Sequence, residues 1–368
     1  MNIAVLTSSR ADYGIYLPLL RKLQEDPEIR LSIIAFGTHT SSFHGHTIDV
    51  IRKDGFQVSH ELNTLVNDDS PSGIAMSYAK TAESFASFWA KNTAYDWIIC
   101  LGDRFEMSAA VQASIPFQYK IAHLYAGDTT LGAIDNIYRH QLTLASKLHF
   151  VSIPEYQLRV TELIGKSGTS SVIGSLSLLN LKELDPESPE EFFSKWGISL
   201  HRKFILVTVH PETVNFQLNE VYAGITESAL RQCLSGFDLV ITMPNADTNG
   251  EIYRTCFQRL KKEAPEKVHL IENFGTKSYF TAMKHAALLV GNSSSGIYEA
   301  ASFGKMVLNI GDRQKGRIAP QNVKHVRFNE QEIVDAVLQN ENLTFDGDNP
   351  FSVENGVELI IERLKNYQ

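Results

Sequence analysis

The six residues from Gly291 to Gly296 form the stretch of this sequence best suited to hold a phosphate group. They read Gly-Asn-Ser-Ser-Ser-Gly, follow the apolar run 286–290 and precede helix-forming residues. This order is typical of a buried parallel strand, a turn and a helix start, whose amide groups and positive dipole end face the turn. Further donors are the hydroxyl groups of Ser293, Ser294 and Ser295. Both glycines allow the backbone to approach a ligand closely.

A second polar stretch, residues 309–317, brings three cationic side chains to the end of another apolar strand. Amide donors at one strand end and positive charge, including that of Arg313, at the next indicate a site for a diphosphate. Glu299, one turn into the helix, is placed to accept hydrogen bonds from the hydroxyls of a ribose. The alternative is an ordinary capped helix, in which Ser294 or Ser295 only satisfies the backbone.

Three aspartates lie after strands or near helix starts in the first half of the sequence. Asp103 comes just after the apolar run 97–101, Asp128 lies in a glycine-containing turn after the run 120–124, and Asp135 lies near the start of a helix. Carboxylates that meet in a partly desolvated site repel each other, which raises the pKa of one and allows an acid and a base side by side. We therefore expect a site for proton transfer. The alternative, strongest for Asp103, is a helix cap.

Arg10 and His210 are further candidates to bind an anion. Arg10 follows the first apolar strand, residues 3–6, and His210 follows the strand at 203–209. Parallel sheets covered by helices bind ligands beyond the carboxyl ends of their strands, where both residues are expected. The alternatives are a helix cap or a surface ion pair for Arg10, and a purely structural role for His210.

The elements that must position these residues alternate between strands and helices. Apolar runs of strand length separated by helical patterns indicate an α/β fold with parallel, Rossmann-like sheets. Strands are expected at 3–6, 31–36, 97–101, 120–124, 147–151, 203–209, 238–242, 267–271 and 286–290. A chain of 368 residues is long enough for two cores.

We expect two domains and a final helix. The first domain, residues 1–178, carries the aspartates, and the second, residues 179–350, carries the diphosphate site. The acidic, proline-containing stretch 183–191 is the expected linker. Residues 351–368 contain apolar positions at helical spacing and are expected to form a helix that packs across the domains.

The composition argues against several classes of protein. The formal net charge of -8 argues against nucleic acid or an anionic membrane as a partner. The three cysteines lie far apart without a CxxC pair, so neither a disulfide framework nor a zinc-thiolate site is expected. The N-terminus lacks the features of a signal peptide, and no apolar run is long enough to span a bilayer. We therefore expect a cytoplasmic protein.

Six motifs, taken in order, give the sequence a resemblance to the hydrolysing UDP-N-acetylglucosamine 2-epimerases of bacterial sialic-acid synthesis. They lie at residues 7–14, 102–106, 134–140, 210–213, 291–296 and 311–317, so the match spans nearly the whole chain. The resemblance implies a glycosyltransferase-B fold, with two domains facing across a cleft, UDP held by the second and the sugar lying against the first. It also implies a homo-oligomer, either a dimer or a tetramer. No metal or other cofactor is expected.

The resemblance further implies a reaction. UDP is lost across C1 and C2 by anti elimination to give 2-acetamidoglucal, and water then adds to release N-acetylmannosamine. The expected catalytic residues are Asp103, Asp128, Asp135 and His210. The residues expected to bind the UDP-sugar are Arg10, His210, Asn245, Phe274, Ser293, Ser294, Ser295, Gly296, Glu299 and Arg313. Relatives usually carry Gly-Gly-Glu where this chain has Ala126-Gly127-Asp128, which leaves Asp103 and Asp135 as the stronger candidates.

Several other activities are compatible with these motifs. The same chemistry on UDP-N,N'-diacetylbacillosamine is the main alternative, because nothing in residues 129–136 identifies the substituents at C4 and C6 of the sugar. A non-hydrolysing 2-epimerase, a glycosyltransferase and a non-catalytic sensor of sugar nucleotides share the expected fold, and fold alone does not decide function.

Overall fold

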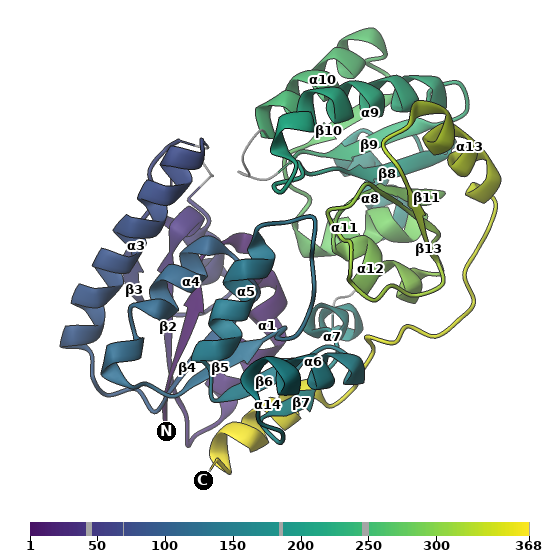
Figure 1. Ribbon diagram of the computed structural model, residues 1–368. Coiled ribbons are helices and arrows are strands. Elements are labelled where there is room, and N and C mark those ends of the chain that lie inside the picture. Colours follow the sequence, from purple (N-terminus) through teal and green to yellow (C-terminus); the bar gives the residue numbers. More distant parts are fainter. Residues whose placement is uncertain (42–45, 69, 184–186, 245–249, 368) are drawn as a thin grey trace. The chain divides into compact units, whose positions relative to one another are not determined.

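The computed structural model describes residues 1–41, 46–68, 70–183, 187–244 and 250–367 and divides the chain into two compact units (Figure 1). Unit 1 comprises Met1–Asp128, Asp135–Asn180 and Phe351–Gln368, and unit 2 comprises Thr129–Ile134 and Leu181–Pro350. Each unit is built on one parallel sheet flanked by helices. The expected α/β fold with two parallel-sheet domains is confirmed.

The sheet of unit 1 has the strand order β3-β2-β1-β4-β5-β6-β7. Its strands are β1 (Asn2–Thr7), β2 (Arg30–Phe36), β3 (Val58–Leu62), β4 (Trp97–Leu101), β5 (Ile121–Leu124), β6 (Leu148–Val151) and β7 (Ser170–Val172). The order reverses between β1 and β4, which pair directly. Doubly wound sheets bind ligands beyond the carboxyl ends of the strands at such a reversal.

The helices of this part of the chain bury one apolar face each. They are α1 (Arg10–Glu25), α2 (Ile48–Lys53), α3 (Pro71–Lys91), α4 (Phe105–Gln112), α5 (Asp135–Ala145), α6 (Pro154–Ile164), α7 (Leu176–Glu183) and α14 (Gly356–Lys365), with 3-10 turns η1 (Gly37–Thr40) and η2 (Ile115–Phe117). In α1, Tyr16, Leu19, Leu20 and Leu23 are fully buried at helical spacing. Helix α14 belongs to unit 1, where the indole nitrogen of Trp97 donates to the carbonyl oxygen of Leu364 at 3.2 Å.

The sheet of unit 2 has the strand order β10-β9-β8-β11-β12-β13. Its strands are β8 (Phe204–Thr208), β9 (Asp238–Thr242), β10 (Val268–Ile271), β11 (Leu288–Gly291), β12 (Val307–Ile310) and β13 (Val323–Val326). Its helices are α8 (Pro189–Trp196), α9 (Asn219–Cys233), α10 (Gly250–Glu263), α11 (Gly275–His285), α12 (Ser295–Tyr298) and α13 (Glu330–Asn340), with 3-10 turns η3 (Phe216–Leu218) and η4 (Ala300–Phe303). Here the order reverses between β8 and β11, which pair in parallel.

Residues 129–134 belong to unit 2 although the residues on both sides of them belong to unit 1. The amide of Leu131 donates to the carbonyl oxygen of Lys315 at 2.8 Å, and the amide of Ile134 donates to the hydroxyl of Thr213 at 3.0 Å. Gly132 lies so close to Asp312 that a side chain there would overlap its backbone oxygen. Unit 1 therefore differs from the continuous stretch 1–178 that we expected, because local hydrogen bonds and close packing assign this segment to unit 2.

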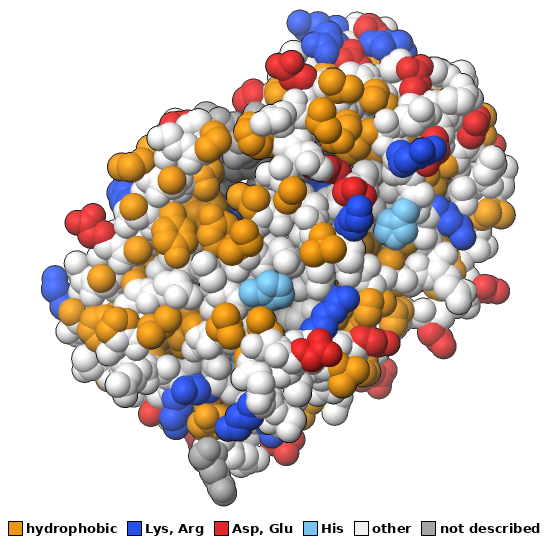
Figure 2. All heavy atoms as spheres, in the orientation of Figure 1, with side chains coloured by type: hydrophobic (Ala, Val, Ile, Leu, Met, Phe, Trp, Pro, Cys, Tyr) orange, Lys and Arg blue, Asp and Glu red, His pale blue; other side chains and the backbone are white. Residues whose placement is uncertain are grey.

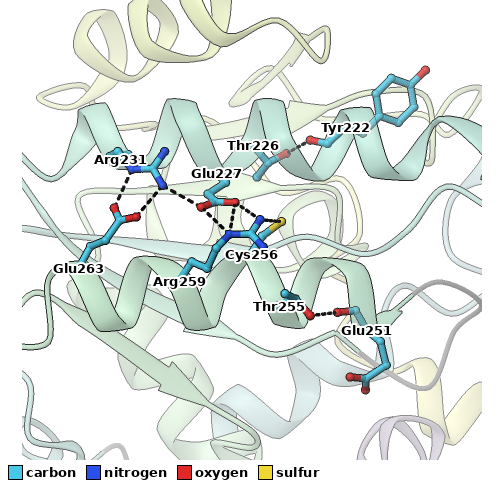
Figure 3. A network of polar contacts seen from close by, with 9 residues as sticks. All are labelled: Tyr222, Thr226, Glu227, Arg231, Glu251, Thr255, Cys256, Arg259 and Glu263. Carbon is cyan, nitrogen blue, oxygen red and sulfur yellow. Dashed lines mark hydrogen bonds and ion pairs between the residues drawn. The ribbon is translucent and has the colours of Figure 1, made fainter.

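Helices α9 and α10 are joined by a network of ion pairs (Figure 3). Glu227 on α9, whose side chain is 7% exposed, accepts hydrogen bonds from Arg231 at 2.8 Å and from Arg259 on α10 at 2.5 Å. Arg231 also pairs with Glu263 at 2.7 Å. Burial alone would raise the pKa of Glu227, but the hydrogen bonds from Arg259 and Arg231 lower it overall.

Some apolar side chains remain on the surface of unit 1, and Figure 2 shows hydrophobic side chains gathered over the region of α3, α4 and α5. Ile137 and Leu144 of α5 are 61% and 59% exposed. Met76 of α3 and Leu158 of α6 are also largely exposed. Apolar patches of this kind on soluble domains are typical of contact surfaces. Within the described residues, no helix combines the length and apolar character required to cross a membrane.

Candidate active site

The serine turn of unit 2 lies directly after β11, at the reversal of strand order. Helix α12 has a single turn and is followed by η4, so Glu299, expected one turn into the helix, is its C-cap residue. Ser294 is its N-cap residue but makes no capping hydrogen bond through its side chain, so the capping alternative is wrong for Ser294. Within the described residues, the amides of Ser293 and Ser294 have no hydrogen-bond acceptor, which leaves two adjacent N–H groups for an anion.

The two glycines of the turn have packing reasons of their own. Gly291 has a φ of 149°, and a side chain there would overlap the backbone oxygen of Thr208 on β8. A side chain at Gly296 would lie 2.9 Å from a methyl group of Val307 on β12. Close packing therefore requires glycine at position 291, and a side chain at position 296 would force Val307 to shift, whatever the turn binds.

The turn from His210 to Thr213 follows the neighbouring strand β8. The side chain of Glu212, 1% exposed, accepts a hydrogen bond from the amide of Asp312 at 2.5 Å, and Arg313 donates to the carbonyl oxygen of Pro211 at 2.6 Å. Burial raises the pKa of Glu212. Two hydrogen bonds thus join the segment after β8 to the segment after β12, the strands on either side of β11 in the sheet.

The three cations of residues 313–317 are each engaged with the protein. Arg313 contacts Pro211, Lys315 pairs with Asp312 at 3.1 Å, and Arg317 donates to the side chain of Gln314 at 2.7 Å. All three still follow β12, next to β11 in the sheet, so the positive charge lies beside the serine turn as the sequence predicted.

Three more predicted binding residues belong to unit 2. Glu299 is 7% exposed at the end of α12, and the hydroxyl of Tyr279 lies 2.6 Å from that of Ser295 in the same helix. Phe274 begins the turn into α11 and packs edge-on against Trp196, with ring centroids 4.7 Å apart. Asn245 lies outside the described residues.

In unit 1, Asp103 follows β4 and forms an ion pair with Arg139 of α5. The side chain of Arg139 is 2% exposed and that of Asp103 is 25% exposed. The N-cap residue of α4 is Arg104, and α4 has no side-chain capping hydrogen bond, so the capping alternative for Asp103 is wrong. This ion pair fixes the position of the Asp103 carboxylate at the end of β4.

The other two aspartates lie at the ends of neighbouring elements. Asp135 begins α5, and residues four apart share a helix face, so it lies on the same side of α5 as Arg139. Asp128 follows β5, the neighbour of β4, and is 1% exposed with the hydroxyl of Ser152 at 3.4 Å from its carboxylate. The three predicted aspartates therefore come from two adjacent strand ends and from the start of α5.

A buried histidine supports the backbone just before Asp103. His123 on β5 is fully buried, and its Nε2 lies 2.8 Å from the carbonyl oxygen of Gly102. Because a carbonyl oxygen only accepts, Nε2 carries the proton and donates it to this bond. Its Nδ1 lies 3.1 Å from the hydroxyl of Thr143 on α5. Burial lowers the pKa of His123 to about 3, so the ring is neutral at physiological pH.

Arg10 is the first residue of α1, whose cap is Ser9, and lies at the carboxyl end of β1. Within the described residues it has no hydrogen-bond or ion-pair partner, and burial lowers its pKa. A partly buried cation without a counter-charge gains from an anionic ligand. In the described part of the chain, no group of three His, Cys, Asp or Glu side chains is arranged to hold a metal ion.

Sequence reasoning missed the residues that hold the others in place: Arg139, His123, Glu212 and Asn292. Each of the four lies within a motif or apolar run described from the sequence, but the sequence does not identify its hydrogen-bond or ion-pair partner. Arg139 is the clearest case, because a buried arginine requires an acid, and Asp103 follows the strand beside it.

Comparison with known proteins gives a family and several relatives. The family profile described as UDP-N-acetylglucosamine 2-epimerase matches residues 21–365. The chain is 32% identical to the polysialic acid biosynthesis protein P7 of Escherichia coli, over 100% of this chain and 94% of that protein. It is 30% identical to the GDP/UDP-N,N'-diacetylbacillosamine 2-epimerase (hydrolyzing) of Campylobacter jejuni, over 89% of this chain and 85% of that protein.

A solved structure has the same fold. The crystal structure of UDP-GlcNAc 2-epimerase from Neisseria meningitidis bound to UDP-GlcNAc superposes with a TM-score of 0.83 at 19% identity. The superposition covers 99% of this chain and 100% of that one. The two proteins therefore share the fold of both units.

Proposed function

Because the chain belongs to the UDP-N-acetylglucosamine 2-epimerase family, we propose that it is the hydrolysing enzyme, which converts UDP-N-acetylglucosamine and water to N-acetylmannosamine and UDP. The arrangement that supports this proposal most strongly is the convergence of the serine turn, His210 and Arg313 at the ends of adjacent strands of unit 2. Adjacent amides, an imidazole and a guanidinium form a set of donors for a diphosphate leaving group.

The first step breaks two bonds of the sugar. A carboxylate of unit 1 removes the proton from C2, and the electron pair of that C–H bond forms the C1–C2 double bond as the C1–O bond breaks. UDP leaves with the electrons of the C1–O bond, and its new charge is stabilised by Arg10, His210 and the amides of Ser293 and Ser294. The product is 2-acetamidoglucal.

The second step adds water across the double bond. The oxygen of water bonds to C1 and gives one proton to a carboxylate, while the electron pair of the double bond takes up a proton at C2. That proton comes from the face opposite to that of the first removal, which gives the manno configuration. Groups on both faces of the ring are required, and Asp103, Asp128 and Asp135 are the proposed set. Asp103 is the proposed base because its ion pair with Arg139 holds the carboxylate in place at the end of β4.

A second substrate has direct support from a relative. The Campylobacter jejuni protein is named as acting on N,N'-diacetylbacillosamine linked to GDP or UDP. The name of the Escherichia coli relative, polysialic acid biosynthesis protein P7, supports UDP-N-acetylglucosamine as the substrate of this chain, because the resemblance links that substrate to sialic-acid synthesis. The two substrates share the same C1–C2 chemistry, so the catalytic set is common to both proposals.

One experiment separates these activities: each UDP-sugar is incubated with the protein in deuterated water and the products are followed by NMR. The proposal predicts a free manno sugar with deuterium at C2 and one equivalent of UDP. A UDP-sugar that persists with inverted C2 would instead identify a non-hydrolysing epimerase. Turnover only after an acceptor is added would identify a glycosyltransferase.

Asp103→Asn tests the proposed base in the same assay. It should retain UDP binding, measured by calorimetry, and lose at least about 100-fold in turnover. Asp49→Asn is the matched control in unit 1, because Asp49 is 57% exposed and pairs with Arg52 on the surface. If Asp103→Asn turns over as fast as Asp49→Asn, Asp103 is not the base.

A further inference from the structure

The backbone of His210 is held from both sides by one buried side chain. Asn292, the second residue of the serine turn, is fully buried. Its Oδ1 accepts from the amide of His210 at 2.7 Å, and its Nδ2 donates to the carbonyl oxygen of His210 at 2.9 Å. The two bonds fix the orientation of the Asn292 amide, because its oxygen faces a donor and its nitrogen faces an acceptor.

This clamp extends the pairing of β8 with β11 beyond the ends of both strands. The last backbone pair of the two strands joins Thr208 to Gly291, and the amide of Asn292 then donates to the carbonyl oxygen of Thr208 at 3.0 Å. The side chain of Asn292 next provides, for His210, the donor and acceptor that another strand residue would have supplied. The backbone at His210 is thus as fully bonded as a strand interior, although it lies in a turn.

The same arrangement occurs two residues later. The side chain of Asn219, also fully buried, accepts from the amide of Glu212 at 3.0 Å and donates to the carbonyl oxygen of Glu212 at 2.9 Å. Gln314 in turn donates to the carbonyl oxygen of Asn292 at 2.8 Å. Buried polar networks with every partner satisfied hold one conformation tightly. The His210 turn is therefore fixed from the β11 side and the α9 side at once.

We propose that Asn292 is a positioning residue that sets the place and direction of the His210 imidazole against the diphosphate of the substrate. This inference rests on the proposed function, in which His210 stabilises the departing UDP. Asn292 acts only through His210, since its own polar side-chain atoms are both used on the His210 backbone. Donors that stabilise a leaving group act strongly only when they are already oriented before the bond breaks.

The matched control is Asn322, another fully buried asparagine of unit 2. Its Nδ2 donates to the carbonyl oxygen of Lys305 at 2.7 Å, and in the described part of the chain its side chain makes no hydrogen bond to residues 210–213. Replacing Asn322 with alanine measures the cost of removing a buried amide from this unit. Any effect of Asn292→Ala beyond that of Asn322→Ala belongs to the clamp.

The test is a double-mutant cycle on kcat/KM with the full-length protein and UDP-N-acetylglucosamine, comparing Asn292→Ala, His210→Ala and the double variant. Asn292→Ala should lower kcat/KM roughly 10- to 100-fold, and adding it to His210→Ala should change the rate by less than about twofold. An equal loss in the presence and absence of the histidine would overturn the proposal. If Asn292→Ala fails to fold, the isosteric Asn292→Asp enters the same cycle.

Nitrogen NMR of the His210 ring gives a readout that does not depend on turnover. The ring resonances and titration midpoint should shift in Asn292→Ala and Asn292→Asp and stay unchanged in Asn322→Ala. Unchanged His210 resonances in the clamp variants would also overturn the proposal. If His210→Ala turns over at the wild-type rate while these resonances shift, the positioning holds and the role of His210 in the proposed function is what fails.

Discussion

Replacing His123 with glutamine is expected to make unit 1 less sensitive to acid. His123 is fully buried on β5, and its neutral ring donates to the carbonyl oxygen of Gly102. Glutamine can place an N–H donor near the position of Nε2 but cannot take up a proton. His123→Gln therefore preserves the donor and removes the titration.

The size of the effect follows from the pKa of the folded state. Burial lowers the pKa of His123 from 6.5 to about 3. Between these values the unfolded chain holds a proton that the folded chain does not, so the free energy of unfolding falls as the pH falls. Above the pKa of the unfolded chain, the free energy of unfolding does not depend on this histidine. Below that pKa it falls by about 1.4 kcal/mol per pH unit, which amounts to about 2 kcal/mol at about pH 5.

Urea unfolding at pH 7 and at about pH 5, followed by tryptophan fluorescence, measures this loss. Trp89 and Trp97 belong to unit 1 and Trp196 to unit 2, so a Trp196→Phe background restricts the signal to unit 1. In that background His123→Gln should lose about 2 kcal/mol less than the parent protein between the two pH values. His201→Gln, at an exposed position of unit 2, should behave like the parent. An identical pH dependence for His123→Gln and the parent would refute the reasoning.

Three further outcomes are expected. Gly291→Ala should destabilise the fold by about 3 kcal/mol in thermal unfolding, because the new side chain would overlap the Thr208 backbone. The control Gly224→Ala, at an open site in α9, should stabilise the fold by up to about 1 kcal/mol. Equal effects of the two substitutions would contradict the packing argument. Glu227→Gln should cost about 1 kcal/mol at neutral pH, with Arg259 half exposed. This difference between Glu227→Gln and the parent should disappear as the pH falls below 4.5, the ordinary pKa of a glutamate. The lowered pKa of Glu227 in the folded protein stabilises the fold only above that pH. Turnover should survive a chelator; loss restored by a divalent metal would contradict this.

The central strands of both sheets could be predicted from the sequence, but three edge strands could not. A strand buried on both faces reads as a continuous apolar run, as in β4 and β11. At the sheet edges, β3 reads Val-Ser-His-Glu-Leu, β7 reads Ser-Ser-Val and β13 reads Val-Lys-His-Val. These strands are partly exposed, so they lack the apolar run on which the prediction depended.

The location of the candidate site could be predicted because ligands bind at the ends of parallel strands. The partners of its residues could not. Asn292 meets His210 only because β11 lies beside β8 in the sheet, although β9 and β10 separate them in the sequence. Arg139 meets Asp103 through a similar contact between α5 and the end of β4. The composition of residues 129–134 also does not predict that they belong to unit 2, since this depends on hydrogen bonds to residues 213 and 315.

The role of the serine turn is tested most directly by a crystal structure of the protein in complex with UDP. The account predicts that oxygens of the diphosphate lie within hydrogen-bond distance of the amides of Ser293 and Ser294 and of the imidazole of His210, with the ribose hydroxyls on Glu299. A diphosphate bound elsewhere, with both serine amides facing water, would contradict it.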